Sequence, residues 1–291
     1  MKRWMLNVLT VFFACVFLVS AVVLGKYLWD SYSQKQREEQ LAQMVDRPQT
    51  RPTRPIQTEP TGTEPTEPEE HVPVTEPTEP PETEPPFEYE QVVTETGETV
   101  EVLRDYAEVF RVNQDLVGWI QIPGTKIDYP VMQTPDSVDY YLKRDFNGQY
   151  SRHGCIYVRE SCDVFAPSDN VTIYGHRMKD GSMFFGLTEY INEAYFRENR
   201  YIYFDTLREY HTYEILSVFI TTASTGQGFR YHAFENAQTP GEFADFVDTC
   251  KELALYETGV SAEYGDKLIT LSTCDYSVTN GRLVVVAKRI D

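Results

Sequence analysis

The sequence predicts a mainly β fold, a closed or nearly closed β-barrel decorated by helices, behind an N-terminal membrane anchor and an extended stalk. Three patterns indicate this arrangement. Residues 4–28 form an apolar run, a Thr-Glu-Pro-rich segment follows it, and short alternating apolar runs bounded by turn residues fill the remainder. We therefore divide the chain into an anchor at 1–28, a stalk at 29–101 and a folded domain at 102–291.

The anchor consists mostly of Val, Leu, Phe and Ala between Trp4 and Leu28. About 20 apolar residues span a bilayer, whereas the apolar core of a secretory signal has about 7–15. This length favours an uncleaved single-pass anchor, while residues 19–21 also fit a cleavage site. Lys2 and Arg3 favour a cytoplasmic N-terminus. We expect the anchor to place the folded domain outside the cell, facing the cell wall.

The stalk is acidic and repetitive. Thr-Glu-Pro recurs between residues 58 and 85, and residues 55–101 contain fourteen Glu but no Lys or Arg, which supplies most of the net charge of −19. Prolines and like charges favour an extended chain without a core, and about 40 such residues would reach roughly 120 Å. Both a stiff spacer in a cell wall and an ordinary disordered linker fit this composition. The remaining residues show no basic patch, which argues against a nucleic-acid partner.

The folded domain opens with helical patterns and continues with strands. Apolar spacing predicts a helix over Val102 to Phe110 and the start of another turn at Gln114. A later helix begins at Pro240, with Thr239 as its N-cap. Runs compatible with β-strands follow one another at residues 118–123, 127–131, 154–158, 171–174, 201–204, 213–221, 268–274 and 283–287. Many short strands separated by turns predict the barrel.

Cys274 ends one of these strands and Arg282 begins the next. If the two strands pair antiparallel, the two side chains lie across the ladder from each other. A cysteine beside a fixed positive charge tends to ionise, and a thiolate is a nucleophile. The same residues also fit a small buried side chain and a surface charge. The domain has too few cysteines for a disulfide framework, and we expect no bridge between Cys155 and Cys162.

His176 is a second candidate because it also follows a strand. The strand at 171–174 ends in Gly175-His176, and a turn and a helix capped by Ser182 follow. The remaining histidines have no comparable setting: His71, His153, His211 and His232. The sequence contains no metal-binding or phosphate-loop motif, so we expect neither a catalytic metal nor a cofactor.

Four segments together resemble class B sortases. They are TLSTC at 270–274 followed by Arg282, YGHRMKDGSMF at 174–184, DLVGWIQIPGTKIDYPVMQ at 115–133 and YYLKRDFNGQYS at 140–151. The resemblance covers essentially all of the folded domain, and the anchor also matches the family's layout. It implies a sortase-like barrel and a cysteine transpeptidase that joins secreted proteins covalently to the cell wall.

The resemblance also implies roles for individual residues. Cys274 is then the nucleophile, His176 the acid/base and Arg282 the group that positions the substrate and stabilises the oxyanion. Ser272 and Asp275 match positions that line the substrate cleft, while either could instead satisfy loop backbone groups. The implied partners are secreted proteins with an Asn-Pro-x-Thr-like sorting motif and, as acceptor, an amine of a cell-wall precursor or of a pilin.

Two other functions stay open on the sequence. A papain-like cell-wall cysteine hydrolase also uses Cys and His, but its cysteine begins a helix and precedes its histidine, whereas His176 precedes Cys274 here. A stalked, non-enzymatic binding module would explain the anchor and the spacer. It would not explain why His176, Cys274 and Arg282 occur together.

Overall fold

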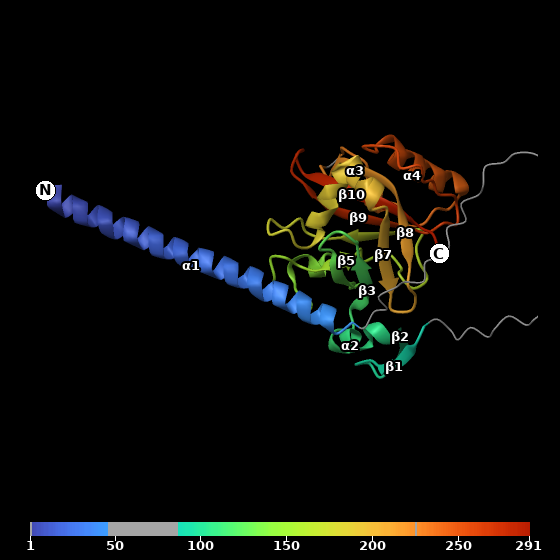
Figure 1. The fold of residues 1–291 in the computed structure, drawn as a ribbon, viewed down its shortest axis with the longest axis horizontal. Coiled ribbons are helices and arrows are strands. Elements are labelled where there is room, and N and C mark those ends of the chain that lie inside the picture. Colours follow the sequence, from blue (N-terminus) through green and yellow to red (C-terminus); the bar gives the residue numbers. More distant parts are fainter. Residues whose placement is uncertain (1, 46–86, 225) are drawn as a thin grey trace, which may run out of the picture.

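A computed structural model describes residues 2–45, 87–224 and 226–291 (Figure 1). The Thr-Glu-Pro repeats and His71 lie outside the described residues, so the structure bears on the predicted stalk only at its two ends. The described residues form a long N-terminal helix and a domain built around a sheet.

Eight strands in the described part of the domain close into a barrel, as the sequence predicts. They follow one another around the barrel in the order β10, β8, β7, β3, β4, β5, β6, β9, and β9 closes the ring by pairing with β10. The pairs β4–β5 and β6–β9 are parallel and the other pairs are antiparallel. The strands are β3 (Leu116–Gln121), β4 (Asp128–Met132), β5 (Ile156–Val158), β6 (Asn170–Tyr174), β7 (Tyr201–Thr206), β8 (Thr212–Thr222), β9 (Leu268–Asp275) and β10 (Gly281–Arg289).

Strand β10 is apolar on both faces because both faces are covered. Leu283 and Val285 belong to the cluster inside the barrel. Val284 and Val286, which alternate with them, belong to a second cluster on the outside. Successive side chains of a strand point to opposite faces. The helix α4 (Pro240–Glu252) supplies apolar side chains to the outer cluster. The continuous apolar runs near the C-terminus therefore encode strands buried on both sides.

Helix α4 agrees with its prediction from the sequence. It begins at Pro240, and the Thr239 hydroxyl accepts a hydrogen bond of 3.3 Å from the Glu242 N–H. Proline is tolerated at the first helical position because its missing N–H has no intrahelical partner there. The N-cap and the apolar stripe thus fix this helix locally.

The predicted helix at Val102 begins later than expected. Val102 and Leu103 belong to the strand β2 (Thr99–Leu103), and helix α2 covers Arg104–Val112. The Leu103 N–H donates to the Leu207 carbonyl oxygen at 2.7 Å, a tertiary contact that fixes an extended backbone. The predicted helical turn at Gln114 is also wrong. The Asn113 side-chain oxygen accepts from the Asp115 N–H at 2.9 Å, a turn that ends the helix and leads into β3.

The helix predicted from Ser182 is a 3-10 helix, η2 (Phe184–Ile191), and Ser182 does not cap it. Its hydroxyl donates to Asp180 at 2.6 Å instead. Met183, at the cap position, has a φ of 55° and accepts no side-chain capping bond. Two further short 3-10 helices, η1 (Tyr140–Lys143) and η3 (Tyr231–Ala233), and the helix α3 (Glu193–Glu198) complete the domain.

Helix α1 (Lys2–Gln43) continues well beyond the predicted anchor. The sequence assigns residues from 29 onward to an extended stalk, but residues 29–43 contain no Gly or Pro. Gln34 and Leu41 are buried, and their spacing of seven residues places them along one helix face, while Val45, just past the end of the helix, is buried as well. This face packs on the barrel, and packing stabilises a helix that composition alone does not predict. Among the described residues, α1 is the one helix long and apolar enough to cross a membrane.

A hairpin occupies the other end of the predicted stalk. Strands β1 (Tyr89–Val93) and β2 pair antiparallel around a turn at Gly97, whose φ is 85°. Val92 and Val102 pack in the same cluster as Leu41. This stretch is therefore ordered rather than extended and coreless, because its alternating valines have a surface to cover.

Candidate active site

Two parallel strands bring His176 and Cys274 to the same end of the barrel. β6 pairs with β9 along its whole length, and the pairing continues one residue further. The Gly175 N–H donates to the Ser272 carbonyl oxygen at 3.2 Å, and the Thr273 hydroxyl donates to the Gly175 carbonyl oxygen at 2.8 Å. His176 follows Gly175, and Cys274 follows Thr273, so the two residues are next to each other at the ends of these two segments. Both line one cleft of about 280 Å³.

Gly175 is required by the close packing behind the histidine. A Cβ atom at this position would lie 2.5 Å from Ile156 Cδ1 and 2.6 Å from Phe184 Cδ2. Both neighbours are fully buried, so neither has room to move aside. Because residue 175 is glycine, the backbone at the end of β6 packs directly against the core. This packing sets the position of the backbone of His176 at the cleft.

Arg282 lies directly opposite Cys274 on the ladder between β9 and β10, as the sequence predicts. Its guanidinium Nη1 donates to the carbonyl oxygens of Gly281, at 2.9 Å, and Asn280, at 3.3 Å. A guanidinium carries five N–H donors, so two backbone bonds hold the group in place without using its full capacity. Arg282 also lines the cleft.

The orientation of His176 is set by a backbone carbonyl. Its Nε2 lies 2.7 Å from the carbonyl oxygen of Leu142, which follows Tyr140 and Tyr141 in η1. A carbonyl oxygen only accepts hydrogen bonds, so Nε2 carries a hydrogen and Nδ1 is the basic nitrogen of the neutral ring. The geometry therefore assigns proton exchange to Nδ1.

Accessibility separates Cys274 from the other thiols of the domain. Cys155, Cys162 and Cys250 are buried, and all are free thiols in the structure. Burial raises the pKa of the Cys162 thiol to about 11 and raises the pKa of the Cys155 and Cys250 thiols as well. Such thiols are inert. Cys274 is half-buried and faces the cleft.

Tyrosines form much of the cleft wall. Tyr157 and Tyr174 pack with ring centroids 5.5 Å apart, and the Tyr157 hydroxyl donates to Asp139 at 2.7 Å. No pattern in the sequence indicates that these tyrosines belong to the site. They occur in strands where an aromatic residue is expected for packing alone, so only the arrangement of the strands reveals that they face the site.

His232 also lines the cleft, although the sequence places it in no active-site setting. His232 lies in η3 rather than at a strand end, and the segment after β8 brings it to the cleft, which no local pattern in the sequence indicates. Burial lowers the pKa of His232, and the positive charges of Arg159, Arg230 and Arg282 lower that pKa further. The His232 ring therefore stays neutral at a lower pH than the ring of an ordinary histidine.

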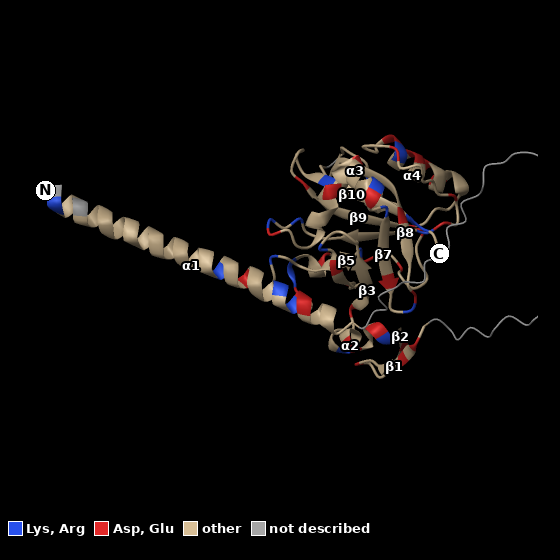
Figure 2. Cartoon of the chain, in the orientation of Figure 1, with Lys and Arg blue, Asp and Glu red and all other residues tan. Residues whose placement is uncertain are grey.

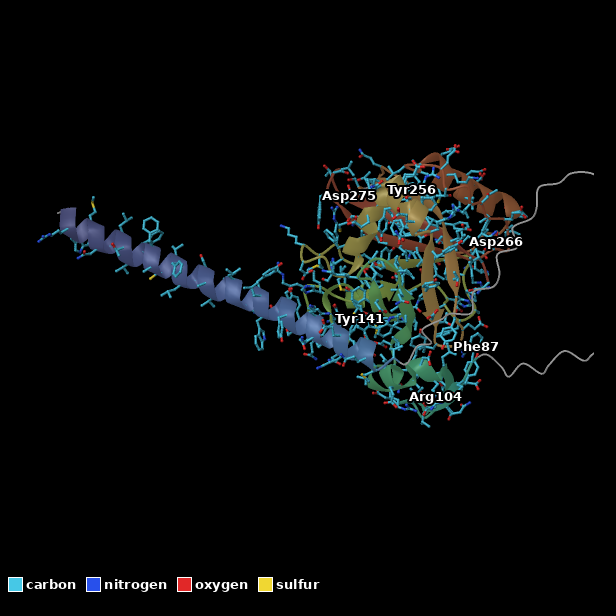
Figure 3. The ribbon with its side chains drawn as sticks, in the orientation of Figure 1. Phe87, Arg104, Tyr141, Tyr256, Asp266 and Asp275 are labelled. Carbon is cyan, nitrogen blue, oxygen red and sulfur yellow. The ribbon has the colours of Figure 1, made fainter. Side chains whose placement is uncertain are left out.

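Ser272 and Asp275, the two predicted substrate contacts, have different surroundings. Ser272 lines the cleft and shares a 2.7 Å hydrogen bond with the Tyr231 hydroxyl. Asp275 lies at the end of the barrel (Figure 3) and is buried. It accepts a 2.9 Å bond from the Ser277 N–H and pairs with Arg177 at 3.3 Å. Asp275 thus satisfies loop groups, and substrate contact stays a prediction for both residues.

Comparison with known proteins decides the family. Residues 120–290 match the sortase domain. The chain belongs to the sortase family. Sortase B of Staphylococcus aureus (strain NCTC 8325 / PS 47) is 33% identical over 182 residues, which cover 62% of this chain and 72% of that protein.

Solved sortase structures have the same fold. Sortase B from Bacillus anthracis in complex with AAEK1 matches with a TM-score of 0.64 and 28% identity, covering 91% of this chain and 99% of that one. A Staphylococcus aureus sortase B–substrate complex matches with a TM-score of 0.60 and 29% identity, covering 65% of this chain and 86% of that one. The class B resemblance predicted from sequence is confirmed. Sortases are cysteine transpeptidases, so this chain is an enzyme of that type rather than a binding module or a papain-like hydrolase.

Proposed function

We propose that this sortase is a membrane-anchored transpeptidase that cleaves a C-terminal sorting signal and transfers the acyl group to a cell-wall or pilin amine through a thioester on Cys274. The observation that carries the proposal is the register of three neighbouring strands. Arg282 is paired with Cys274, and His176 extends the strand on the other side of Cys274.

In the proposed first half-reaction, the Cys274 sulfur attacks the carbonyl carbon of the scissile peptide bond. The C–N bond breaks, the acyl group stays on sulfur as a thioester, and His176 Nδ1 gives a proton to the leaving amine. The bond between Nε2 and the Leu142 carbonyl oxygen supports this role because it holds the ring while Nδ1 is protonated or neutral.

In the second half-reaction an acceptor amine attacks the thioester carbon. His176 Nδ1 takes the proton from the amine, a new amide bond forms and the Cys274 thiolate leaves. Arg282 stabilises the oxyanion in both steps, since its held guanidinium supplies fixed positive charge without reorganisation. The substrates we expect carry an Asn-Pro-x-Thr-like motif.

We further propose that α1 anchors the enzyme in the membrane with the catalytic domain outside the cell. Residues 4–28 are long enough to cross a bilayer, and Lys2 and Arg3 flank the end that would remain in the cytoplasm. The exposure of the apolar side chains along this part of α1 supports the anchor, because they have no protein surface to cover.

The test uses a fluorogenic peptide containing the sorting motif, an amine acceptor and mass spectrometry of the intact protein. Wild type should show an acyl adduct that disappears when amine is added. Cys274→Ala should abolish both the adduct and peptide cleavage, while Cys162→Ala, which removes a buried thiol, should leave the adduct in place. Turnover by the Cys274→Ala variant above background would overturn the assignment of the nucleophile.

A further inference from the structure

The contact between α1 and the catalytic domain begins where the apolar run ends. Tyr27 and Ser31 are partly buried, and the buried Gln34 and Leu41 continue the contact further along the helix. The helix is unbroken from Lys2 to Gln43. No linker therefore separates the last apolar turn from the part of α1 that packs on the barrel.

Two loops of the domain reach this first contact. The Arg152 guanidinium lies over the Tyr27 ring at 5.5 Å. The Ser31 hydroxyl donates to Asp180 at 2.7 Å, and Asp180 in turn bonds the buried His153 at 2.8 Å. Asp180 lies four residues after His176 in the same loop. The helix is thus joined to the loop that carries the acid/base residue.

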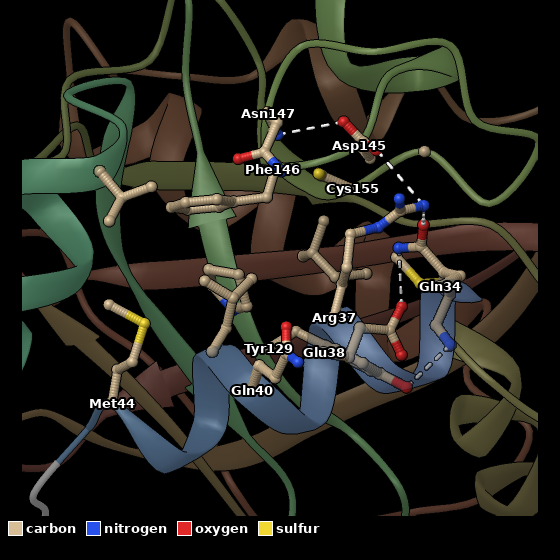
Figure 4. A pocket seen from close by; sticks show the side chains of 16 residues that line it. Gln34, Arg37, Glu38, Gln40, Met44, Tyr129, Asp145, Phe146, Asn147 and Cys155 are labelled. Atoms are coloured by element: carbon tan, nitrogen blue, oxygen red, sulfur yellow. Dashed lines mark hydrogen bonds and ion pairs between the residues drawn. The ribbon is translucent and has the colours of Figure 1, made fainter. Parts of the chain in front are cut away.

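The contact becomes a buried interface further along α1 (Figure 4). Arg37 pairs at 3.4 Å with Asp145, whose side chain is 3% exposed. Gln34 bonds Glu38 at 2.9 Å and also contacts the buried Ser151. The Asp145 carboxylate is buried, and Arg37, whose side chain is 39% exposed, supplies the positive charge that a buried carboxylate requires. The domain therefore packs directly on the helix.

This attachment sets the height of the domain above a membrane. An α-helix rises 1.5 Å per residue, so about 20 residues from Trp4 cross a hydrocarbon core of about 30 Å. Tyr27 to Ser31 then lie roughly 6–12 Å beyond that core, at the depth of the lipid headgroups. The loops that contact these residues lie at the same depth.

The side chains at this depth suit an anionic lipid surface. Arg152, Lys179 and Lys126 are exposed on the loops facing the helix, and Lys126 Nζ lies beside Gly181 of the His176 loop. Asp180 is already bonded to His153 and Ser31. Figure 2 shows blue on the loops that project from the domain toward the N-terminal part of α1, in a chain whose net charge is −19. Each cation near an anionic membrane surface contributes to binding.

Exposed aromatic side chains gather at the same level. Trp29 is 69% exposed, Tyr32 60% and Tyr150, in the Arg152 loop, 76%. Trp and Tyr are enriched at membrane–water interfaces because their rings are amphipathic. The exposed cations and the exposed aromatic side chains thus both indicate contact with an anionic membrane surface.

We infer that the catalytic domain is seated directly on the bilayer, with Arg152, Lys179 and Lys126 against anionic phospholipid headgroups. This inference rests on the proposed anchoring by α1. It replaces the long reach expected of a stalk between membrane and domain, because the acidic repeats follow the docked helix instead of preceding it.

The test measures the distance of two positions from the headgroups in the full chain. A fluorophore is attached at Tyr150→Cys or, as the control on α4, at exposed Asp248→Cys, each in a Cys15→Ala/Cys274→Ala background. The protein is reconstituted in nanodiscs of phosphatidylcholine with and without phosphatidylglycerol, with a nitroxide on part of the headgroups. We expect strong quenching at position 150, more with phosphatidylglycerol, and little quenching at position 248.

A charge variant tests the contact with lipid. Arg152→Gln/Lys179→Gln should lose the additional quenching that phosphatidylglycerol causes, whereas Lys251→Gln/Arg197→Gln, which removes two cations from other exposed surfaces, should retain it. Equal, weak quenching at both positions would overturn the seating while leaving the anchor and the chemistry intact. Strong quenching at position 150 that is the same with and without phosphatidylglycerol would overturn the contact between the three cations and anionic headgroups. A chain that fails to enter nanodiscs would overturn the anchor and this inference together, and peptide cleavage measured in detergent reports separately on the reaction.

Discussion

Arg282 differs from most surface arginines in that backbone carbonyls hold its guanidinium, on a residue paired with Cys274, the proposed nucleophile. The bonds to the Gly281 and Asn280 oxygens fix the head group rather than the aliphatic stem. A lysine would keep the charge but not the planar fork. The residue therefore offers a direct test of whether geometry or charge matters at this position.

We expect Arg282→Lys to lose at least about tenfold in kcat/KM and Arg282→Ala roughly a hundredfold or more, since losing one oxyanion donor typically costs about 10²–10³ in rate. The measurement is cleavage of the fluorogenic sorting peptide, together with a thermal melt of each variant, which should change little. An Arg282→Lys enzyme within about twofold of wild type, with an unchanged melt, would remove the arginine from the mechanism.

The ion pair between Arg177 and Asp275 connects the residue after His176 with the residue after Cys274. The Asp275 side chain is 4% exposed and that of Arg177 23%, and the Arg177 guanidinium also lies 5.1 Å from the Tyr276 ring. The pair ties the two catalytic loops together beyond the last backbone contact between β6 and β9. We therefore expect Asp275 to act as a positioning residue.

We expect Arg177→Gln to lower kcat about tenfold to a hundredfold with a small change in KM, because a displacement of about 1 Å at the reacting groups can cost that much. Asp275→Asn should behave similarly, and the double variant should recover part of the loss because no buried charge is left unpaired. If Asp275 instead contacts the substrate, its variant changes the preference among sorting peptides and the double variant shows no recovery.

At the scale of elements, the strands can be predicted from the sequence, whereas features that depend on contacts between distant segments cannot. The continuous apolar run from Leu283 to Val286 is a local signal, and all eight predicted strands occur in the barrel. The start of α2 was misplaced because Leu103 bonds Leu207, a hundred positions away in the sequence. His232 was missed for the same reason, since a loop from another part of the chain brings it to the cleft. The three candidate residues could be found because each lies at or just beyond the end of a strand, in a segment that resembles a family motif.

Gly175 tests how far the end of β6 depends on its packing. We expect Gly175→Ala to destabilise the fold by about 1–3 kcal/mol, because the new methyl group meets Ile156 and Phe184 in a close-packed core. Activity should fall further than stability accounts for, since His176 follows directly. Chemical denaturation gives the free energy of unfolding, and kcat/KM is measured where both proteins are folded.

Gly241→Ala in the first turn of α4 is the matched control. A Cβ there meets nothing closer than Thr239 Oγ1 at 3.8 Å. Alanine in a helix is more stable than glycine by about 0.5–1 kcal/mol, so this variant should be neutral or more stable, with full activity. A Gly175→Ala enzyme that matches the control in both measurements would show that the strand end has more freedom than the packing indicates.

At the scale of the whole molecule, the domain has a folding boundary that stays a prediction. We expect a protein beginning at Pro86 to fold, because all eight barrel strands and the hairpin β1–β2 follow that residue. It should be less stable than the chain from Trp29, because Leu41 and Val45 pack in the cluster that contains Trp119. Thermal melts of the two proteins measure the difference. A soluble protein from Pro86 without a cooperative transition would show that α1 is part of the folding unit.

The position of β9 in the barrel has a consequence for the order of events in the cell. β9 is held between β6 and β10. β9 carries Cys274 and β10 carries Arg282, and these are the last two strands of the barrel in the sequence. During synthesis and export the N-terminal part of a chain emerges first. A partly emerged chain that contains β6 but not β9 therefore has His176 without Cys274 or Arg282. With the proposed roles of Cys274 and Arg282, we expect the chain to become reactive only when β9 and β10 complete the barrel.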